Sequence, residues 1–425
     1  MITAVSTALS GLNADTDAIN VIGNDLANLN TTGYKANELE FQDLMAENLN
    51  PSGTSGQLGL GVGQVDAVTN YSQGSIQTTN GATDAAIQGN GFFVVSNPTT
   101  GQTLYTRDGS FEVNSSGQLT TASGDLVQGW SAVNGVVNTN GAIGNLTMPV
   151  GTTIPATATT TMNFGLNLDS SATVGQPDAT VTAPIQVYDS QGVAHTLTAT
   201  FTKTANNAWS YNFTIPAADV GAAGPAPVSV ANGALTFDQN GNLLTPAFAA
   251  GPIPVSISGP AANTLADGAS SLSINWSLYN TSGTPTISQL AEASSVNSTS
   301  QNGYAAGTVS NVALQNGGTV MATYTNGQQI AIGQLALAGI ANPQSLSQVG
   351  NNNLAVDANT ATPVVGAAGT GGRGQIVAGA LESSTVDIAT EFANLLTFQR
   401  SYQANSRVIT TADELAQETV NLIHS

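Results

Sequence analysis

The chain has 425 residues, a formal net charge of −20 and no cysteine. With only six basic residues, it offers no cationic surface for nucleic acid and little attraction to an anionic membrane. The absence of cysteine excludes disulfides, thiolate catalysis and cysteine-ligated metals. No basic residue precedes Lys35 and no apolar run approaches the length of a membrane span, so we expect neither a cleaved signal peptide nor membrane insertion.

The first 29 residues are predicted to form a helix. Apolar residues follow one another there at steps of three and four, which is the spacing of one helix face. The pattern fits the a/d seam of a coiled coil, and an ordinary amphipathic core helix is the alternative. The predicted seam of the N-terminal helix consists of Ile2, Val5, Leu9, Leu12, Ile19 and Leu26.

The middle of the chain is predicted to be β-structure. Runs rich in Thr and Val alternate with turns centred on Gly, Asn and Asp. Turns at 114–117, 189–192 and 238–241 share the order Asp/Asn-x-x-Gly, and we expect a positive φ at each final Gly. Segments 151–185 and 216–270 are rich in Pro, Gly, Ala and Thr, which indicates loops or edge strands.

The end of the chain is predicted to form a second helix. Apolar residues recur there at steps of seven, with Asn, Gln, Ser and Thr between them. We expect the two terminal helices to pack on each other or on copies from other chains. The predicted seam of the C-terminal helix consists of Ile388, Phe392, Leu395, Tyr402, Ile409, Ala416 and Ile423.

The charges are concentrated at the two ends of the chain. Residues 1–47 contain seven acids and residues 381–425 contain six, whereas residues 126–370 contain eight acids and one base, Lys203. This uneven distribution indicates two kinds of structure in one chain.

No catalytic, cofactor or metal site is expected. Residues 369–374 match G-x-G-x-x-G but lack a following βαβ unit, and the next acids, at 382, 387 and 391, are expected on the terminal helix. Residues 238–242 resemble the start of a calcium loop without its final Glu, so a hairpin turn is favoured. The two histidines, His195 and His424, cannot form a histidine cluster, and His195 is expected at the surface of a strand.

Four motifs resemble those of the bacterial flagellar rod and hook proteins. Residues 24–35 resemble the N-terminal signature of that family, residues 391–405 its C-terminal counterpart, and residues 84–93 and 105–109 its first β domain. The family-motif positions near the N-terminus are Asn24, Leu26, Ala27, Asn28, Asn30, Thr31, Gly33, Tyr34 and Lys35.

The segment between Pro149 and Leu290 bears on the choice between rod and hook. It contains about 140 residues, and residues 187–197 and 302–307 resemble the hook members of the family. A distal rod protein of unusual length is the alternative within the family. A secreted β-rich adhesin or surface-layer protein fits the composition alone but leaves the terminal heptads unexplained.

The resemblance implies a multidomain α+β fold, in which the N- and C-terminal helices pair as a coiled coil and two β-rich outer domains are nested between them. The implied segments are 1–29, the N-terminal helix of an inner tube; 30–75, an extended or β-hairpin brace between the inner and middle layers; 76–149 and 291–372, the two parts of the first β domain; 150–290, the outer β insert; and 373–425, the C-terminal helix of the inner tube.

The resemblance also implies a function. The chain is expected to be a structural subunit, not an enzyme, that self-assembles into a curved hollow hook and transmits motor torque from rod to filament as a flexible joint. A straight drive shaft built by a distal rod protein is the alternative. The implied partners are further copies of the chain, the distal rod, hook cap and hook–filament junction proteins, and the flagellar type III export apparatus. The implied location is extracellular, in the hook and basal body, after export without a cleaved signal peptide.

Overall fold

The computed structural model describes residues 2–44, 47–48, 57–58, 60–149, 151–259 and 264–423. Side chains are described for residues 5–44, 60–149, 151–259 and 264–420. The chain divides into two compact units. Unit 1 comprises Met1–Val150, Asn311–Thr323 and Gln329–Ser425, and unit 2 comprises Gly151–Ser310 and Tyr324–Gln328. In the described part of the chain, no helix combines the length and apolar character needed to span a membrane.

Unit 1 contains both long helices, α1 (Ile2–Ala27) and α2 (Ile388–Ile423). Its strands before unit 2 are β1 (Asn37–Glu40), β2 (Glu47–Asn48), β3 (Gln57–Leu58), β4 (Asp66–Thr69), β5 (Ile76–Thr78), β6 (Ala85–Gln88), β7 (Phe92–Ser96), β8 (Thr103–Thr106), β9 (Phe111–Val113), β10 (Leu119–Thr121), β11 (Leu126–Val133), β12 (Val136–Val137) and β13 (Gly144–Asn145). Two later strands are shared with unit 2, since β25 (Gly307–Leu314) begins there and β26 (Thr319–Tyr324) ends there. The remaining strands of unit 1 are β27 (Gln329–Leu335), β28 (Leu337–Gly339), β29 (Leu346–Gly350), β30 (Asn353–Val356), β31 (Val364–Gly366), β32 (Gln375–Ala378) and β33 (Ala380–Glu382).

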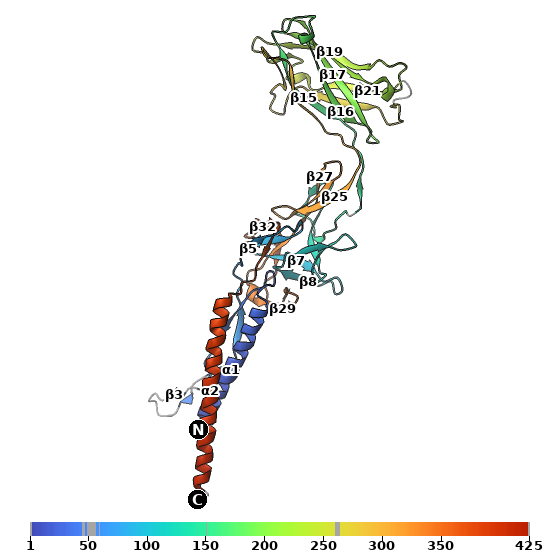
Figure 1. Cartoon of the computed structure of the whole chain (residues 1–425). Helices are drawn as coiled ribbons and strands as arrows, with labels where there is room; N and C mark the ends of the chain where they lie inside the picture. Colours follow the sequence, from blue (N-terminus) through green and yellow to red (C-terminus); the bar gives the residue numbers. More distant parts are fainter. Residues whose placement is uncertain are drawn as a thin grey trace. The chain divides into compact units, whose positions relative to one another are not determined.

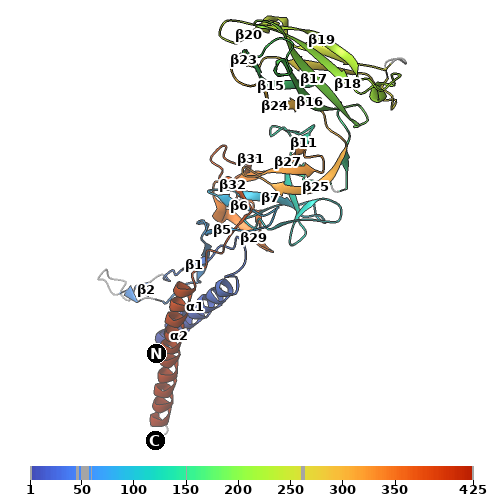
Figure 2. The ribbon, with the colours of Figure 1, turned by 45° about the horizontal axis from the view of Figure 1, so that its top comes forward.

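The two terminal helices lie side by side (Figures 1 and 2). α1 is free of proline and buries small residues, Ala8, Ala14 and Ala18, which favour a helix and allow a close neighbour. At Gly11 there is no room for a side chain, because an added Cβ would lie 2.7 Å from Nδ2 of Asn405 on α2. The buried apolar residues described on α1 are these three alanines and Ile22, and none of them belongs to the predicted seam.

α2 begins later than the 373 boundary expected for the C-terminal helical segment. Residues 375–378 pair as β32 with β6, and residues 380–382 pair as β33 with β5. The helix starts after Asp387, whose Oδ1 accepts the N–H of Thr390 at 2.8 Å as an N-cap. The bond from the Thr390 N–H, together with a bond from the Thr390 side chain, lowers the pKa of the Asp387 carboxyl. Two short strands therefore tie the chain to the sheet before the helix begins.

β7 is the central strand of unit 1. It pairs with β8, β11 and β28, and the sheet continues through β27 and β26 on one side and β30 and β29 on the other. Phe93 and Val95 belong to one buried apolar cluster, and Phe92 and Val94 belong to another. Because successive side chains point to opposite faces, β7 is covered on both faces, which explains its continuous apolar sequence.

Unit 2 is a β-sandwich. One sheet contains β16 to β20, and the other is built around β15, with β22, β23 and β24 as partners and β21 beside β22 (Figure 2). One apolar cluster takes side chains from both sheets, including Phe164 of β15, Phe201 of β17 and Trp276 of β22. The bounds of its strands are β14 (Thr153–Ile154), β15 (Thr161–Asp169), β16 (Thr180–Tyr188), β17 (Ala194–Ala205), β18 (Ala208–Ile215), β19 (Val228–Phe237), β20 (Leu243–Thr245), β21 (Ile253–Ile257), β22 (Leu272–Ser277), β23 (Ile287–Leu290) and β24 (Ser295–Gln301).

The prediction of loops or edge strands in 151–185 and 216–270 is wrong for β15 and β19. β15 lies between other strands of its sheet, and β19 lies between β18 and β20. Their composition resembles that of loops, but alternate residues of β15, from Met162 to Leu168, are buried. The burial of one face outweighs the weak strand preference of Gly and Asn.

The predicted hairpin turns are confirmed. In the turn at 189–192, Gly192 has φ 88° and its N–H donates to the carbonyl of Asp189. Oδ1 of Asp189 also accepts the N–H groups of Gln191 and Val193, which fixes the turn from within. The turns at 114–117 and 238–241 repeat these contacts. The predicted α+β class is also confirmed, with the terminal helices in contact and β-rich sheets in the chain between them.

Candidate functional site

The described residues of the predicted seam are half-buried or exposed on the helix pair. On α1, Leu9 is 50% exposed, and Val5, Leu12, Ile19 and Leu26 are half-buried. On α2, Ile388, Phe392 and Tyr402 are exposed, and Leu395, Ile409 and Ala416 are half-buried. The side chains of Ile2 and Ile423 lie outside the described residues. No seam residue with a described side chain is buried within the chain.

Four of the seam residues meet in one groove. Val5 and Leu9 from α1 and Ile409 and Ala416 from α2 line an open space of about 620 Å³. The groove is largely apolar, because Asp413 is its only charged lining residue among those described. The two helices thus bring these residues together without closing over them.

α2 exposes further apolar side chains on more than one side. Ile388, Phe392, Leu396 and Tyr402 share one face of the helix, named here the first α2 face. Val408 and Leu415, one heptad apart, lie on a different face, named here the second α2 face. Leu396 is 54% exposed and Leu415 is 57% exposed. A helix of a single folded chain ordinarily buries such residues, so two open faces mark α2 as a surface for association.

A polar contact sets the register between the helices. Nδ2 of Asn405 on α2 donates to Oδ2 of Asp15 on α1 at 2.9 Å, beside Gly11. Burial raises the pKa of the Asp15 carboxyl, and the bond from Asn405 opposes that rise. Asn405 lies within the C-terminal motif, whereas Asp15 was not singled out from the sequence. Because the two side chains meet in only one alignment of the helices, this partly buried bond favours that alignment over its neighbours.

The segment after α1 packs against α2. The rings of Phe41 and Phe398 are stacked, with centroids 5.5 Å apart. Further along the same segment, the N–H of Val62 donates to Oγ of Ser10 on α1 at 3.2 Å. The described parts of residues 30–75 therefore contact both helices.

The family-motif residues form a polar junction around Asp25, at the end of α1. The hydroxyl of Tyr34 donates to Oδ1 of Asp25 at 2.7 Å, and the N–H of Asn37 donates to Oδ2 at 2.8 Å. Asn24 donates to the Tyr34 oxygen, and Asn28 accepts from the hydroxyl of Thr31. Burial and the neighbouring Asp25 carboxylate raise the pKa of Tyr34, so its hydroxyl keeps its proton and remains a donor.

Other motif positions shape the backbone at the junction. Gly33 has φ 67°, and a Cβ there would lie 2.6 Å from the carbonyl carbon of Arg107, so only glycine fits. Its N–H donates to the carbonyl of Glu382 at 2.7 Å. Leu26 is half-buried, and Ala27 and Asn30 are exposed at the end of the helix. The structure therefore brings Asn24, Asn28, Thr31, Gly33, Tyr34 and Lys35 together, and leaves Leu26, Ala27 and Asn30 at the margin.

Lys35 and Arg107 converge on a single buried carboxylate. Nζ of Lys35 lies 2.6 Å from Oε1 of Glu382, and Nη1 of Arg107 lies 3.1 Å from Oε2. Lys35 also donates to the carbonyl of Ser72, and Arg107 to the carbonyl of Gly89. Burial lowers the pKa of Lys35, while the bond and the charge of Glu382 act in the opposite direction. Three segments distant in the sequence are thus joined by charge.

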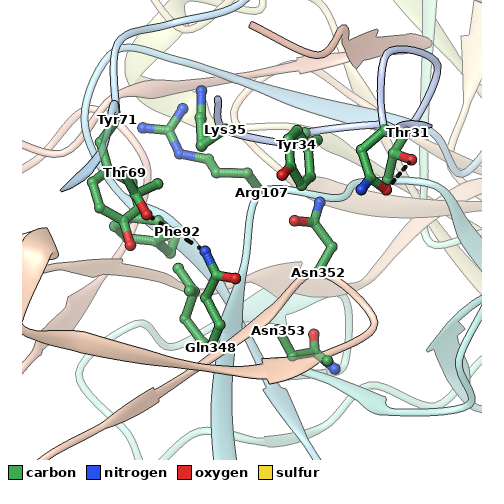
Figure 3. A pocket seen from close by; sticks show the side chains of 14 residues that line it. Thr31, Tyr34, Lys35, Thr69, Tyr71, Phe92, Arg107, Gln348, Asn352 and Asn353 are labelled. Atoms are coloured by element: carbon green, nitrogen blue, oxygen red, sulfur yellow. Dashed lines mark hydrogen bonds between the residues drawn. The ribbon is translucent and has the colours of Figure 1, made fainter. Parts of the chain in front are cut away.

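A cavity of about 110 Å³ adjoins this network (Figure 3). Figure 3 shows Lys35, Arg107 and Tyr34 lining it from one side and Gln348, Asn352 and Asn353 from the other. Nδ2 of Asn352 donates to the carbonyl of Thr32 at 2.7 Å. The guanidinium of Arg107 lies 5.3 Å from the centre of the Phe92 ring, within cation–π range. The lining residues are engaged in holding the junction together, which is a structural rather than a catalytic arrangement.

Sequence reasoning missed the central acids of this junction. Glu382 was expected on the terminal helix, but it lies in β33, which pairs with β5. Its carboxylate is there within 2.6 Å of Nζ of Lys35. Asp387 precedes α2 as its cap, and only Glu391 of the three acids lies within the helix. One signal was present in the sequence: three of the six bases, Lys35, Arg107 and Arg400, occur in family motifs, and a base that is buried requires an acid.

The expectation for His195 is also wrong. Its side chain is buried in unit 2, with 4% of the residue exposed, rather than at the surface of a strand. Strand alternation places His195 on the same face of β17 as Leu197 and Phe201, which are buried, and loops that carry acids cover it at the edge of the sandwich. Asp238, by contrast, lies in a hairpin turn, as favoured from the sequence.

Four family models match successive parts of the chain. The model described as "Flagella basal body rod protein" matches residues 6–35, and "Flagellar hook protein FlgE/F/G D1 domain" matches residues 86–167. "Flagellar basal body protein FlaE D2 domain" matches residues 167–304, and "Flagellar basal body rod FlgEFG protein C-terminal" matches residues 377–422. The matches include both terminal helices and the family-motif junction.

Similar proteins extend over the whole chain. The flagellar hook protein FlgE of Treponema pallidum (strain Nichols) is 32% identical, with 99% of this chain and 100% of that protein covered. The flagellar hook protein FlgE of Salmonella typhimurium is 32% identical, with 98% and 99% covered. The crystal structure of Helicobacter pylori flagellar hook protein FlgE2 has a TM-score of 0.51 at 12% identity and covers 71% of this chain and 99% of that chain, a similarity of fold alone.

Proposed function

Because this chain belongs to the flagellar hook protein FlgE family, and is therefore a structural subunit of the hook, we propose that it polymerises through its terminal helices into a curved hollow tube. The family is structural and not enzymatic. The tube would act as a flexible joint that transmits torque from the rod to the filament. The observation that carries the proposal is the apolar surface left open on α1 and α2.

The helix pair has more apolar surface than it can cover alone. Both α2 faces and the groove lined by Val5, Leu9, Ile409 and Ala416 are open in a single chain. Burying one Leu or Phe side chain contributes about 1.5–3 kcal/mol. Since α2 is open on two sides, one neighbouring copy cannot satisfy it, and contacts with several copies support a closed tube rather than a dimer.

The predicted seam residues take their role from this arrangement. We assign Val5, Leu9, Leu12, Ile19 and Leu26 of α1, and Ile388, Phe392, Leu395, Tyr402, Ile409 and Ala416 of α2, to contacts between copies. The junction around Asp25 and Glu382 would hold the helix pair on the unit 1 sheet, so that force applied to the helices reaches the sheet.

Bending requires contacts that can change from one subunit to the next. Residues 126–370 carry eight acids and one base, and the exposed strand β24 consists mainly of Ser, Thr and Asn. Neutral polar surfaces offer many weak contacts of similar energy, whereas fixed ion pairs favour one register. We propose that such surfaces let neighbouring subunits slide as the hook turns.

The proposed partners follow from the family. They are further copies of the chain, the distal rod protein, the hook cap protein, the hook–filament junction protein and the flagellar type III export apparatus. The proposed route is export without a cleaved signal peptide to the outside of the cell. The match of residues 167–304 to a D2 domain, and the hook proteins that match along the full chain, support a hook subunit over a distal rod protein.

The assembly surface can be tested by polar substitution at exposed positions. Leu396→Ser on the first α2 face and Leu415→Ser on the second remove apolar surface without touching a buried side chain. Losing about 2 kcal/mol per contact raises the critical concentration for assembly about thirty-fold. Val133→Ser, at an exposed position in β11, is the matched control.

Sedimentation measures the critical concentration, circular dichroism checks that the helices persist, and electron microscopy gives the shape of the polymer. Curved tubes are expected from the parent chain, and straight tubes would favour the rod alternative. Unchanged assembly of both Leu variants would remove α2 from the proposed interface.

A further inference from the structure

Unit 2 contains a buried imidazole surrounded by three carboxylates. Nε2 of His195 lies 3.3 Å from Oδ2 of Asp189 and 3.7 Å from Oδ2 of Asp267. Nδ1 of His195 lies 3.2 Å from Oδ2 of Asp219. His195 is 4% exposed and Asp189 is fully buried. One base therefore faces three acids at the edge of the sandwich.

The four side chains come from both sheets. Asp189 lies in the β16–β17 turn and His195 near the start of β17, while Asp219 lies in the short 3₁₀ helix Ala217–Val220 after β18. Asp267 lies between β21 and β22, which belong to the other sheet. The N–H of Ala266 donates to the carbonyl of Asp219 at 3.0 Å, so the loops are already in contact.

Two of the carboxylates are oriented in the same way. Oδ1 of Asp189 accepts the N–H groups of Gln191 and Val193, and Oδ1 of Asp267 accepts the N–H of Ala269. Each acid thus uses one oxygen to fix its own loop and directs the other toward Nε2 of His195. The three donor atoms Nε2, Oδ2 of Asp189 and Oδ2 of Asp267 lie within 4.8 Å of one another.

The distances favour metal ligation over ion pairing. A charge-assisted N–H···O bond is about 2.7–2.9 Å long, so separations of 3.3 and 3.7 Å are too long for a strong one. Zinc binds His nitrogen and carboxylate oxygen at about 2.0–2.2 Å, which places neighbouring ligands of a tetrahedral ion about 3.4 Å apart. The observed separations match the edges of such a tetrahedron.

From this geometry we infer that His195, Asp189 and Asp267 bind a divalent transition-metal ion of the zinc type, with water in the fourth position. The ion would tie the two sheets of unit 2 together at one edge. Asp267 is partly exposed, with 28% of its side chain accessible, which gives the ion a path from solvent.

Asp219 has a separate part in the site. A ligating histidine ordinarily donates its other ring N–H to a carboxylate, which fixes the tautomer and orients the ring. Asp219 is placed to accept from Nδ1, leaving the Nε2 lone pair directed at the other two acids. Asp219 is therefore a positioning residue rather than a ligand.

The composition of the cluster also favours a cation. Three carboxylates, one of them fully buried, face a single imidazole. A neutral imidazole would leave the carboxylates without a counter-charge, whereas a divalent ion supplies two.

The test uses the full chain with Zn²⁺ and Co²⁺ as probes. A Trp130→Phe background leaves Trp209 and Trp276, both buried in the unit 2 core, as the fluorescent reporters of its unfolding. Titration calorimetry should show one saturable Zn²⁺ site, and excess Zn²⁺ should raise the unfolding midpoint of unit 2 in proportion to the logarithm of its concentration. Co²⁺ should give visible absorption of the intensity typical of four-coordinate cobalt.

Variants separate the ligands from the positioning residue. Asp219→Asn should weaken Zn²⁺ binding about 10- to 100-fold. His195→Gln and Asp267→Asn should weaken it more than Asp219→Asn does, and Asp267→Asn, at a partly exposed position, keeps the test valid if His195→Gln does not fold. Asp238→Asn is the matched control, because Asp238 makes the same turn contacts as Asp189 but faces no histidine. His424→Gln controls for the other histidine of the chain.

The inference fails if the folded chain binds no Zn²⁺ at one-to-one stoichiometry. It also fails if binding survives both His195→Gln and Asp267→Asn, or is lost in Asp238→Asn or His424→Gln. An ion pair between protonated His195 and Asp189 would then account for the cluster.

Discussion

Nζ of Lys35 lies 2.6 Å from Oε1 of Glu382, although the two residues are 347 positions apart in the chain. Arg107 reaches the other oxygen of the same carboxylate. The network joins the segment after α1, the end of β8 and the strand that leads into α2. The two ends of the chain are thus fastened to each other and to the unit 1 sheet, as the proposed transmission of torque requires.

Replacing Glu382 with Gln should destabilise unit 1. The variant leaves Lys35 and Arg107 buried without a counter-charge, and breaking a buried pair in this way costs about 3–5 kcal/mol. Urea unfolding followed by circular dichroism and by Trp130 fluorescence, in a chain without the other two tryptophans, measures the change. Glu414→Gln, at an exposed position on α2, should stay within about 0.5 kcal/mol of the parent. A loss below 1 kcal/mol for Glu382→Gln, on the order of a surface substitution, would contradict the role given to the network.

The contact between Asp15 and Asn405 predicts an order of stability. Asp15→Asn keeps an oxygen that can accept from Asn405 and removes a buried charge, so the helix pair should be at least as stable at neutral pH. Asp15→Ala leaves the Asn405 amide without its partner and should cost about 1–3 kcal/mol. Thermal unfolding by far-ultraviolet circular dichroism gives the order. If Asp15→Asn were less stable than Asp15→Ala, the contact with Asn405 would not be what holds the helices together.

Glu391 makes the junction sensitive to pH. Burial, and then the charge of Asp25, raises the pKa of Glu391 above its ordinary value of 4.5. The folded state therefore binds this proton more tightly than the unfolded chain. The contribution of Glu391 to stability is greatest below pH 4.5 and is lost as the pH rises through the folded-state pKa.

Urea unfolding at pH 5 and pH 7 isolates this effect when the parent is compared with Glu391→Gln. The parent should gain more stability on acidification than the variant, because Gln carries no proton to bind. Glu418→Gln, exposed on the same helix, should behave as the parent does. If Glu391→Gln gained more stability on acidification than the parent, folding would lower the pKa of Glu391 instead of raising it, and the prediction would be wrong.

Helices, turns and family were predictable from the sequence because each depends on residues close together in the chain. Spacing at three, four and seven residues marked both helices, and Gly at fixed offsets marked the turns. The buried apolar residues of α1 were not predicted, because Ala8, Ala14 and Ala18 carry little apolar signal and Ile22 lies outside the predicted seam. The described residues of the predicted seam are half-buried or exposed instead.

The junction and the His195 cluster were beyond sequence reasoning because their members meet only through the fold. Glu382 reaches Lys35 by the pairing of β33 with β5, which no local pattern specifies. Strand alternation puts His195 on the same face as Leu197, but it does not show that Asp219 and Asp267 approach the imidazole from two loops. The prediction of a loop or edge strand at β15 was based on composition and was wrong, because the burial of alternate residues determines the structure there.

The central claim is that the open faces of α2 become buried between subunits, and thiol labelling tests it most directly. The chain has no cysteine, so Leu396→Cys and Leu415→Cys each introduce a single thiol at an exposed position. Both should react readily with a maleimide in the unassembled chain and at least tenfold more slowly in the polymer. Val133→Cys, 73% exposed in β11, shows whether the reagent reaches the polymer. Equal labelling rates at 396 and 415 before and after assembly would contradict the account.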